Sequence, residues 1–142
     1  MVADFSLGYI EPMSKEVLIQ GEVVSGRKLG KKIGFPTVNI VYKGDVSGIF
    51  VGEILLDGKW LQAVIHIGKK PTIQDDEVTL EAHILNWTGD VKTGTIVSVK
   101  LLKKIRDTKK FEDLKQLEKA IEKDVEFARN WYNLGDSVIK TK

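Results

Sequence analysis

The stretch GIFVGEILLDGKWLQAVIHI, residues 48–67, decides the fold class. Two runs rich in Val, Ile and Leu flank the pair Asp57-Gly58. An Asp-Gly pair is typical of a two-residue hairpin turn, because both residues tolerate a positive φ. The stretch therefore predicts two antiparallel neighbouring strands, Gly48–Leu56 and Trp60–Ile67.

Short apolar runs of the same kind, each closed by glycine or turn residues, occur on both sides of this hairpin. They predict four more strands: Val17–Val24, Thr37–Tyr42, Val78–Asn86 and Thr95–Lys103. No helical pattern separates the strands, and parallel neighbours need a crossover of about a dozen residues or more. We therefore expect a mainly β protein, built as a six-stranded antiparallel Greek-key barrel.

Beyond the last predicted strand the apolar spacing changes to three and four, through Leu114, Leu117, Ile121, Val125 and Ala128. This period predicts one C-terminal amphipathic helix packed against the barrel, from about Phe111 to Tyr132, with Asn133 to Gly135 as its stop signal. We expect an N-terminal extension over residues 1–15 and one domain over 16–135. Within that domain the barrel would cover 16–106 and the helix about 111–132, and 136–142 would form a tail.

Composition limits the possible classes of function. The chain has 142 residues, 42% of them hydrophobic, which suits a single domain. With 22 Lys and Arg against 20 Asp and Glu, a basic surface could only be local, which weakens a nucleic-acid role. There is no cysteine, signal-peptide pattern or long apolar run. We expect a cytoplasmic protein with no membrane partner.

The stretch GRKLGKKIGFPTVNI, residues 26–40, has the composition of an anion-binding loop. Gly26, Gly30 and Gly34 allow backbone amides to turn toward a phosphate, and Lys31 is one of the cations beside them. Taken alone, the loop fits a flexible solvated segment better than a phosphate site. It is not a P-loop, because the second glycine is not followed by Lys and then Ser or Thr, and no helix follows.

The end of that stretch is more informative. Pro36 fixes its own φ and holds Phe35 in extended geometry, so Thr37 is presented at the start of a strand. Thr37 and Asn39 are two residues apart on that strand and therefore point to the same side. Hydroxyl and amide oxygens are hard ligands suited to Mg²⁺, which completes its shell with water and phosphates.

Five separated motifs resemble, in order, those of the riboflavin kinases, the flavokinase domain that also forms the C-terminal half of bacterial bifunctional FAD synthetases. They are GFPTVNI (34–40), SGIFVGEI (47–54), HIGKKPTI (66–73), LEAHIL (80–85) and IRDTKKF (105–111). The resemblance implies a six-stranded antiparallel barrel with a C-terminal helix. It also implies a kinase that uses ATP, riboflavin and Mg²⁺, and releases FMN and ADP.

The resemblance also implies roles for individual residues. Glu81 would be the catalytic base on the ribityl hydroxyl of the flavin, and Mg²⁺ would be bound by Thr37 and Asn39. The flavin would be bound by Arg106 and Phe111. Nucleotide and phosphate would be bound by Gly26, Lys31, Gly34, Thr37, Asn39, Ile84 and Asn86.

The pattern alone leaves other interpretations open for these residues. Glu81 also fits the solvated face of a strand whose other face is Leu80, Ala82 and Ile84. Phe111 also fits a core residue that anchors the helix, and the basic run KKIRDTKK (103–110) also fits a solvated surface. His83 is interpreted as structural, and nothing in the sequence groups it with His66 as a zinc site.

Departures from the family pattern leave the nucleotide preference open. Lys31 stands where the family often has arginine, which removes a bidentate donor, and Thr93 stands where the family has tyrosine. The His-x-Gly-His motif of the adenylyltransferase domain is missing from the sequence. We therefore expect formation of FMN but not of FAD.

Two other functions remain as alternatives. Small barrels with basic loops and exposed aromatic residues such as Trp60 or Trp87 often bind single-stranded nucleic acid. A flavin-binding regulator without catalysis is the other alternative, although intact Thr37, Asn39 and Glu81 argue against it. For the kinase we expect a monomer whose partners are small molecules, with no nucleic acid.

Overall fold

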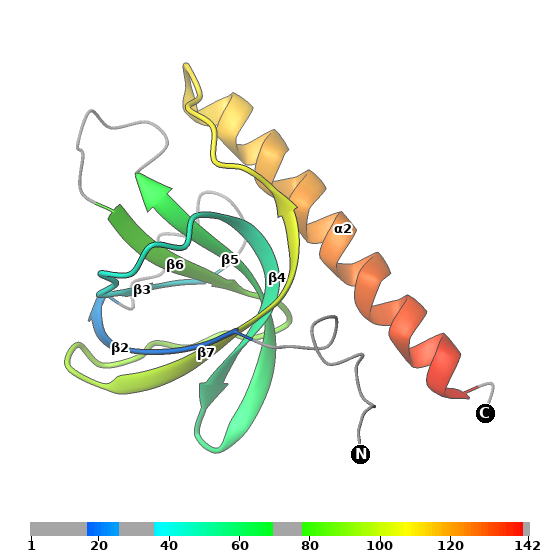
Figure 1. Cartoon of the computed structure of the whole chain (residues 1–142), viewed down its shortest axis with the longest axis horizontal. Coiled ribbons are helices and arrows are strands. Elements are labelled where there is room, and N and C mark those ends of the chain that lie inside the picture. Colours follow the sequence, from blue (N-terminus) through cyan, green and yellow to red (C-terminus); the bar gives the residue numbers. More distant parts are fainter. Residues whose placement is uncertain (1–16, 26–35, 70–77, 141–142) are drawn as a thin grey trace, which may run out of the picture.

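The computed structural model describes residues 17–25, 36–69 and 78–140 of the chain (Figure 1). In chain order its elements are the strands and helix β2 (Val17–Ser25), β3 (Thr37–Ile40), β4 (Gly48–Leu56), β5 (Lys59–Lys69), β6 (Val78–Ile84), β7 (Ile96–Arg106) and α2 (Leu114–Lys140). Figure 1 shows α2 lying along the outside of the barrel. No described helix is both long enough and apolar enough to cross a membrane.

The described strands close into a barrel in the order β2-β3-β6-β5-β4-β7, and every neighbouring pair is antiparallel. Strands β4, β5 and β6 follow one another as neighbours, and β7 returns to pair with β4, which is the Greek-key order. The predicted fold class, a six-stranded antiparallel Greek-key barrel with a C-terminal helix, is confirmed.

The hairpin of residues 48–67 forms as predicted. Asp57 has φ 50° and Gly58 has φ 75°, and Leu56 pairs with Lys59 across the turn. Positive φ at both central residues is the signature of a type I′ turn, whose twist matches that of the flanking strands. Strand β7 continues to Arg106, past the predicted end at Lys103, because its last residues pair with the start of β4.

Alternation along the strands builds two separate cores. Inward residues such as Val38, Phe50, Ile65 and Val99 fill the barrel. Outward residues of β4 and β5, together with Leu85 directly after β6, form a second cluster against the helix: Ile49, Val51, Val64 and Leu85 pack with Ile121, Val125 and Ala128. Burying a large aliphatic side chain contributes roughly 1.5–3 kcal/mol, so this second cluster holds α2 on the barrel.

The helix boundaries differ from the prediction at both ends. Asp113 caps the helix, because its Oδ1 accepts a hydrogen bond from the backbone N–H of Gln116 at 2.9 Å, so α2 begins at Leu114 rather than Phe111. The predicted end at Tyr132 is wrong, since α2 continues to Lys140. A glycine inside a helix costs only about 1 kcal/mol relative to alanine, so Gly135 does not stop it. The predicted tail, 136–142, therefore begins inside the helix.

Tyr132 fastens the middle of α2 to the barrel. Its hydroxyl donates a hydrogen bond to the carbonyl oxygen of Gly52 on β4, next to a register shift between Val51 and Gly52. Burial raises the pKa of the Tyr132 phenol, with a further contribution from Glu53. The hydroxyl therefore stays protonated and available as a donor at neutral pH.

Candidate functional site

One cross-strand row on the outer face of the barrel contains much of the candidate site. Asn39 on β3 pairs with Glu81 on β6, Glu81 pairs with His66 on β5, His66 pairs with Ile49 on β4, and Ile49 pairs with Arg106 on β7. Directly opposite residues have Cβ atoms about 5 Å apart. The register thus brings residues that are far apart in the sequence into one line.

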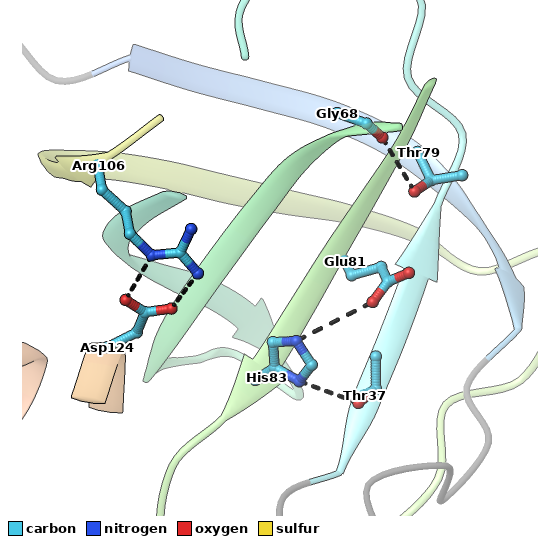
Figure 2. Close-up of polar contacts among 7 residues, drawn as sticks. All are labelled: Thr37, Gly68, Thr79, Glu81, His83, Arg106 and Asp124. Atoms are coloured by element: carbon cyan, nitrogen blue, oxygen red, sulfur yellow. Dashed lines mark hydrogen bonds and ion pairs between the residues drawn. The ribbon is translucent and has the colours of Figure 1, made fainter. Parts of the chain in front are cut away.

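A second, shorter row runs beside the first and contains Thr37, His83 and Val64. Figure 2 shows the His83 ring between Thr37 and Glu81. The Nδ1 atom of His83 lies 3.1 Å from Oγ1 of Thr37, and its Nε2 atom lies 4.0 Å from Oε1 of Glu81. The imidazole therefore lies between the predicted metal ligand and the predicted base.

His83 is a neutral imidazole in this arrangement. Its side chain is buried, and burial together with the nearby His66 lowers the pKa of His83 to about 4. A carboxylate facing Nε2 favours the tautomer with its proton on Nε2, which leaves Nδ1 to accept the hydrogen bond from the Thr37 hydroxyl. The Thr37 oxygen then keeps its lone pairs for another partner.

The helix and the segment before it close both rows into a cavity of about 100 Å³ between the barrel and α2. It gathers five residues that the sequence assigned to the site: Thr37, Asn39, Glu81, Arg106 and Phe111. The rest of the wall is Ile49, Val64, His66, His83, Lys109, Leu117, Ile121 and Asp124. A polar barrel face and an apolar helix face thus meet across a small space.

The family model for riboflavin kinase matches residues 13–132, most of the chain and all of the barrel. The chain belongs to the riboflavin kinase family. The resemblance seen in its five motifs is thereby confirmed.

Two proteins with similar sequences are longer than this chain. The bifunctional riboflavin kinase/FMN adenylyltransferase of Escherichia coli K12 is 36% identical over 138 residues, which are 94% of this chain and 44% of that protein. The RNA-binding riboflavin kinase RibR of Bacillus subtilis is 35% identical over 111 residues, which are 76% of this chain and 48% of that protein. The chain thus spans less than half the length of either relative.

A solved structure supports the fold. The riboflavin kinase of Trypanosoma brucei matches with a TM-score of 0.55 and 24% identity, over 83% of this chain and 80% of that one. At this identity the match shows the barrel architecture alone.

Within this riboflavin kinase fold, Arg106 is joined to the helix. Its Nε donates to Oδ1 of Asp124 at 3.0 Å and its Nη2 donates to Oδ2 at 2.9 Å, as Figure 2 shows. Its Nη1 donates to the carbonyl oxygen of Asp107 at 3.1 Å. The guanidinium also lies 5.8 Å from the centre of the Phe111 ring. Arg106 therefore forms part of the cavity wall and also ties β7 to α2.

Asp124 was missed from the sequence, although a signal was present. It lies three residues after Ile121 and directly before Val125, so the helical period places an acidic residue on the apolar face. Only 4% of its surface is exposed. A buried carboxylate needs a cationic partner, and Arg106 supplies it.

His66 was also missed as a site residue. It faces outward on β5 between the buried residues Ile65 and Ile67 and lines the cavity. Burial and then the positive charge of Arg106 lower the pKa of His66 to about 4, against a smaller opposite effect of a backbone hydrogen bond. The signal available in the sequence was the β5 alternation, but the pairing with Glu81 requires the sheet register.

The other predicted residues do not line this cavity. The Ile84 side chain is fully buried inside the barrel, and its backbone N–H donates to the carbonyl oxygen of Pro36 at 3.0 Å. Asn86 is exposed on the turn after β6, with φ 54°. The predicted phosphate-binding residues Gly26, Lys31 and Gly34 lie outside the described residues.

Proposed function

We propose that the chain is a riboflavin kinase that transfers the terminal phosphate of ATP to the ribityl 5'-hydroxyl of riboflavin and releases FMN and ADP. The observation that carries the proposal is the position of Glu81. Glu81 lies directly opposite Asn39 and beside Thr37, and all three residues line one cavity. This places a proton acceptor next to oxygen donors suited to a cation.

Glu81 acts as the base in this proposal. Its side chain is 21% exposed, so the carboxylate can be reached from the cavity while His83 lies 4.0 Å from one of its oxygens. Phosphoryl transfer depends mainly on alignment of the attacking oxygen and on neutralisation of phosphate charge. A carboxylate that accepts a hydrogen bond from the 5'-hydroxyl orients that oxygen and takes up its proton as the bond to phosphorus forms.

The donor set of this face fits Mg²⁺. The Thr37 hydroxyl, 3.1 Å from Nδ1 of His83, and the Asn39 side-chain carbonyl are both oxygen ligands at the same wall. We assign the metal to Thr37 and Asn39. When bound there, Mg²⁺ would neutralise charge on the nucleotide phosphates. Gly26, Lys31 and Gly34 remain the predicted phosphate contacts, and Asn86 and the backbone of Ile84 the predicted nucleotide contacts.

The flavin would enter from the side of Phe111. A groove of about 470 Å³ adjoins the cavity and shares Arg106, Lys109, Phe111 and Asp124 with it, while Gln116, Lys119, Ala120 and Lys123 complete its wall. The cavity of about 100 Å³ is large enough for a polyol chain but not for a three-ring system. We place the ring system in the groove, against Phe111, with the ribityl chain directed to Glu81.

A panel of nucleotides and metals tests the function. The purified chain is incubated with riboflavin, one of ATP, CTP or GTP, and Mg²⁺, Mn²⁺ or Zn²⁺, and products are separated by chromatography. We expect FMN with ATP and Mg²⁺ and no FAD. The absence of FMN with every combination would refute the proposal, and the nucleotide profile would give the preference that Lys31 and Thr93 leave open.

Nucleic-acid binding is not favoured as an alternative. Such binding uses exposed aromatic surfaces, but Trp87 packs against the barrel core, and the Trp60 ring, although 37% exposed, already has the Lys100 ammonium 4.1 Å from its centre. An inactive flavin-binding regulator would bind riboflavin without turnover, which the same panel detects. We keep the expectations of a monomer and of a cytoplasmic location as part of the proposal.

A further inference from the structure

A buried pair of polar side chains lies in the wall of the cavity. Thr37 on β3 and His83 on β6 are directly opposite each other, and both are buried. Oγ1 of Thr37 and Nδ1 of His83 are 3.1 Å apart, which is hydrogen-bonding distance, and Figure 2 shows the contact. The register of β3 and β6 sets this contact, so it is a fixed feature of the barrel.

The fold does not require a polar pair at these positions. The partner of His83 on β5 is Val64, and its neighbours along β6, Ala82 and Ile84, are buried and apolar. Replacing both members of a buried hydrogen-bonded pair by apolar groups of the same shape can be nearly neutral for stability. A hydroxyl and an imidazole in these surroundings therefore call for an explanation beyond packing.

The hydrogen bond decides what the Thr37 oxygen offers to the cavity. A hydroxyl has one O–H donor and two lone pairs, and its hydrogen rotates to suit its partners. A buried imidazole is neutral, so one ring nitrogen carries a proton and the other a lone pair. Oε1 of Glu81, 4.0 Å from Nε2 of His83, favours the proton on Nε2. Nδ1 then accepts from the Thr37 hydroxyl, and both lone pairs of the Thr37 oxygen stay available to a cation.

We propose that His83 is a positioning residue for the reaction: it accepts a hydrogen bond from the Thr37 hydroxyl at Nδ1 and so directs the lone pairs of the Thr37 oxygen at the cation that accompanies the nucleotide. This inference rests on the proposed riboflavin kinase function and on the assignment of Thr37 as a metal ligand. Residues that hold a metal ligand in place typically contribute about 10- to 100-fold to metal affinity. His83 itself binds no metal and transfers no proton.

Binding of ADP with and without Mg²⁺ measures the proposed role without turnover. Each titration is followed by calorimetry, once with Mg²⁺ and once with EDTA. We expect His83→Leu to weaken binding of Mg·ADP about 10- to 100-fold and binding of metal-free ADP less than about twofold. Asparagine carries its amide oxygen on Cγ, as histidine carries Nδ1, so His83→Asn should recover part of the affinity. Glutamine places its amide one carbon further out, so His83→Gln should recover less.

Two variants separate this role from a general effect of substitution. Thr37→Val removes the hydroxyl that His83 holds, so the double variant of Thr37→Val and His83→Leu should lose no more Mg·ADP affinity than Thr37→Val alone. Thr79→Val is the matched control on β6. It removes a threonine hydroxyl that donates to the carbonyl oxygen of Gly68 at 3.4 Å, and Thr79 does not line the cavity. We expect Thr79→Val to bind Mg·ADP like the unsubstituted chain.

Equal losses with Mg²⁺ and with EDTA in His83→Leu, or no loss of Mg·ADP affinity, would overturn the inference, and FMN formation by the unsubstituted chain would show that the kinase stands. Fully additive losses in the double variant would also overturn it. An unsubstituted chain that neither binds Mg·ADP nor forms FMN would refute the proposed function and the inference together.

If His83→Leu does not fold, long-range ¹H–¹⁵N NMR spectra of the unsubstituted chain without metal decide. They should show the proton of the His83 ring on Nε2 and none on Nδ1. A proton on Nδ1 would overturn the inference, because Nδ1 could not then accept from Thr37.

Discussion

Removal of the Asp124 carboxylate charge tests the connection between the barrel and the helix. In Asp124→Asn the side chain keeps its shape but loses the charge that receives two hydrogen bonds from Arg106, at 3.0 and 2.9 Å. Removing one partner of a fully buried ion pair costs about 3–5 kcal/mol. The Arg106 side chain is 28% exposed, so water can solvate part of the remaining charge. We therefore expect a loss of about 2–3 kcal/mol in the free energy of unfolding.

Urea unfolding followed by tryptophan fluorescence measures this loss, since Trp131 lies on the same helix. The pair Lys104–Asp107 supplies the control, because it also joins a β7 residue to an aspartate but has side chains that are 49% and 86% exposed. Asp107→Asn should leave the free energy of unfolding close to that of the unsubstituted chain, because water screens an exposed pair. A double-mutant cycle of Asp124→Asn with Arg106→Gln should give a clear coupling energy. Equal, small losses for Asp124→Asn and Asp107→Asn would refute the reasoning.

Two further predictions concern the stability of the barrel. A Cβ on Gly52 would lie 2.3 Å from the Lys100 carbonyl oxygen and 2.8 Å from Cγ1 of Ile65. Gly52→Ala should therefore lower the free energy of unfolding, measured by urea titration, by more than about 2 kcal/mol. An unchanged free energy of unfolding would contradict this close packing. The pKa of His83 is about 4 in the folded chain and 6.5 in the unfolded chain, so the unfolded chain takes up the proton first as the pH falls. The contribution of neutral His83 to the free energy of unfolding is therefore complete above pH 6.5 and is lost as the pH falls through 4. The loss in the free energy of unfolding is about 3 kcal/mol at most. In His83→Gln the free energy of unfolding should depend less on pH between 6.5 and 4, and an unchanged slope would contradict the role of His83.

Much of the fold follows from local signals in the sequence. The Asp57-Gly58 turn fixed the central hairpin, and the period of two along the strands separated the barrel interior from its outer face. The end of the helix was predicted wrongly because Asn133 and Gly135 are weak stop signals in a segment without proline. The unfavourable helix propensities of these two residues, about 1 kcal/mol or less each, were too small to end the helix at that point.

Site residues could be predicted where they lie in a motif with an assigned role. They could not be predicted where their role depends on strand register or helix packing. Thr37, Asn39 and Glu81 lie within motifs, and the cavity brings them together. Asp124 lies in none of the five motifs, and the motif that begins at His66 assigned no site role to that histidine. Their partners, Arg106 and Glu81, lie 18 and 15 residues away in the sequence. Pairing at such distances is set by strand register and helix packing, which no local pattern encodes.

The role of Glu81 is tested most directly by Glu81→Gln, measured for riboflavin binding and for FMN formation in the same preparation. Glutamine keeps the size and one oxygen but cannot accept a proton, so riboflavin should bind within a fewfold of its usual affinity while FMN formation falls by a factor of about 10²–10⁴. FMN formation by Glu81→Gln at the rate of the unsubstituted chain would contradict the account.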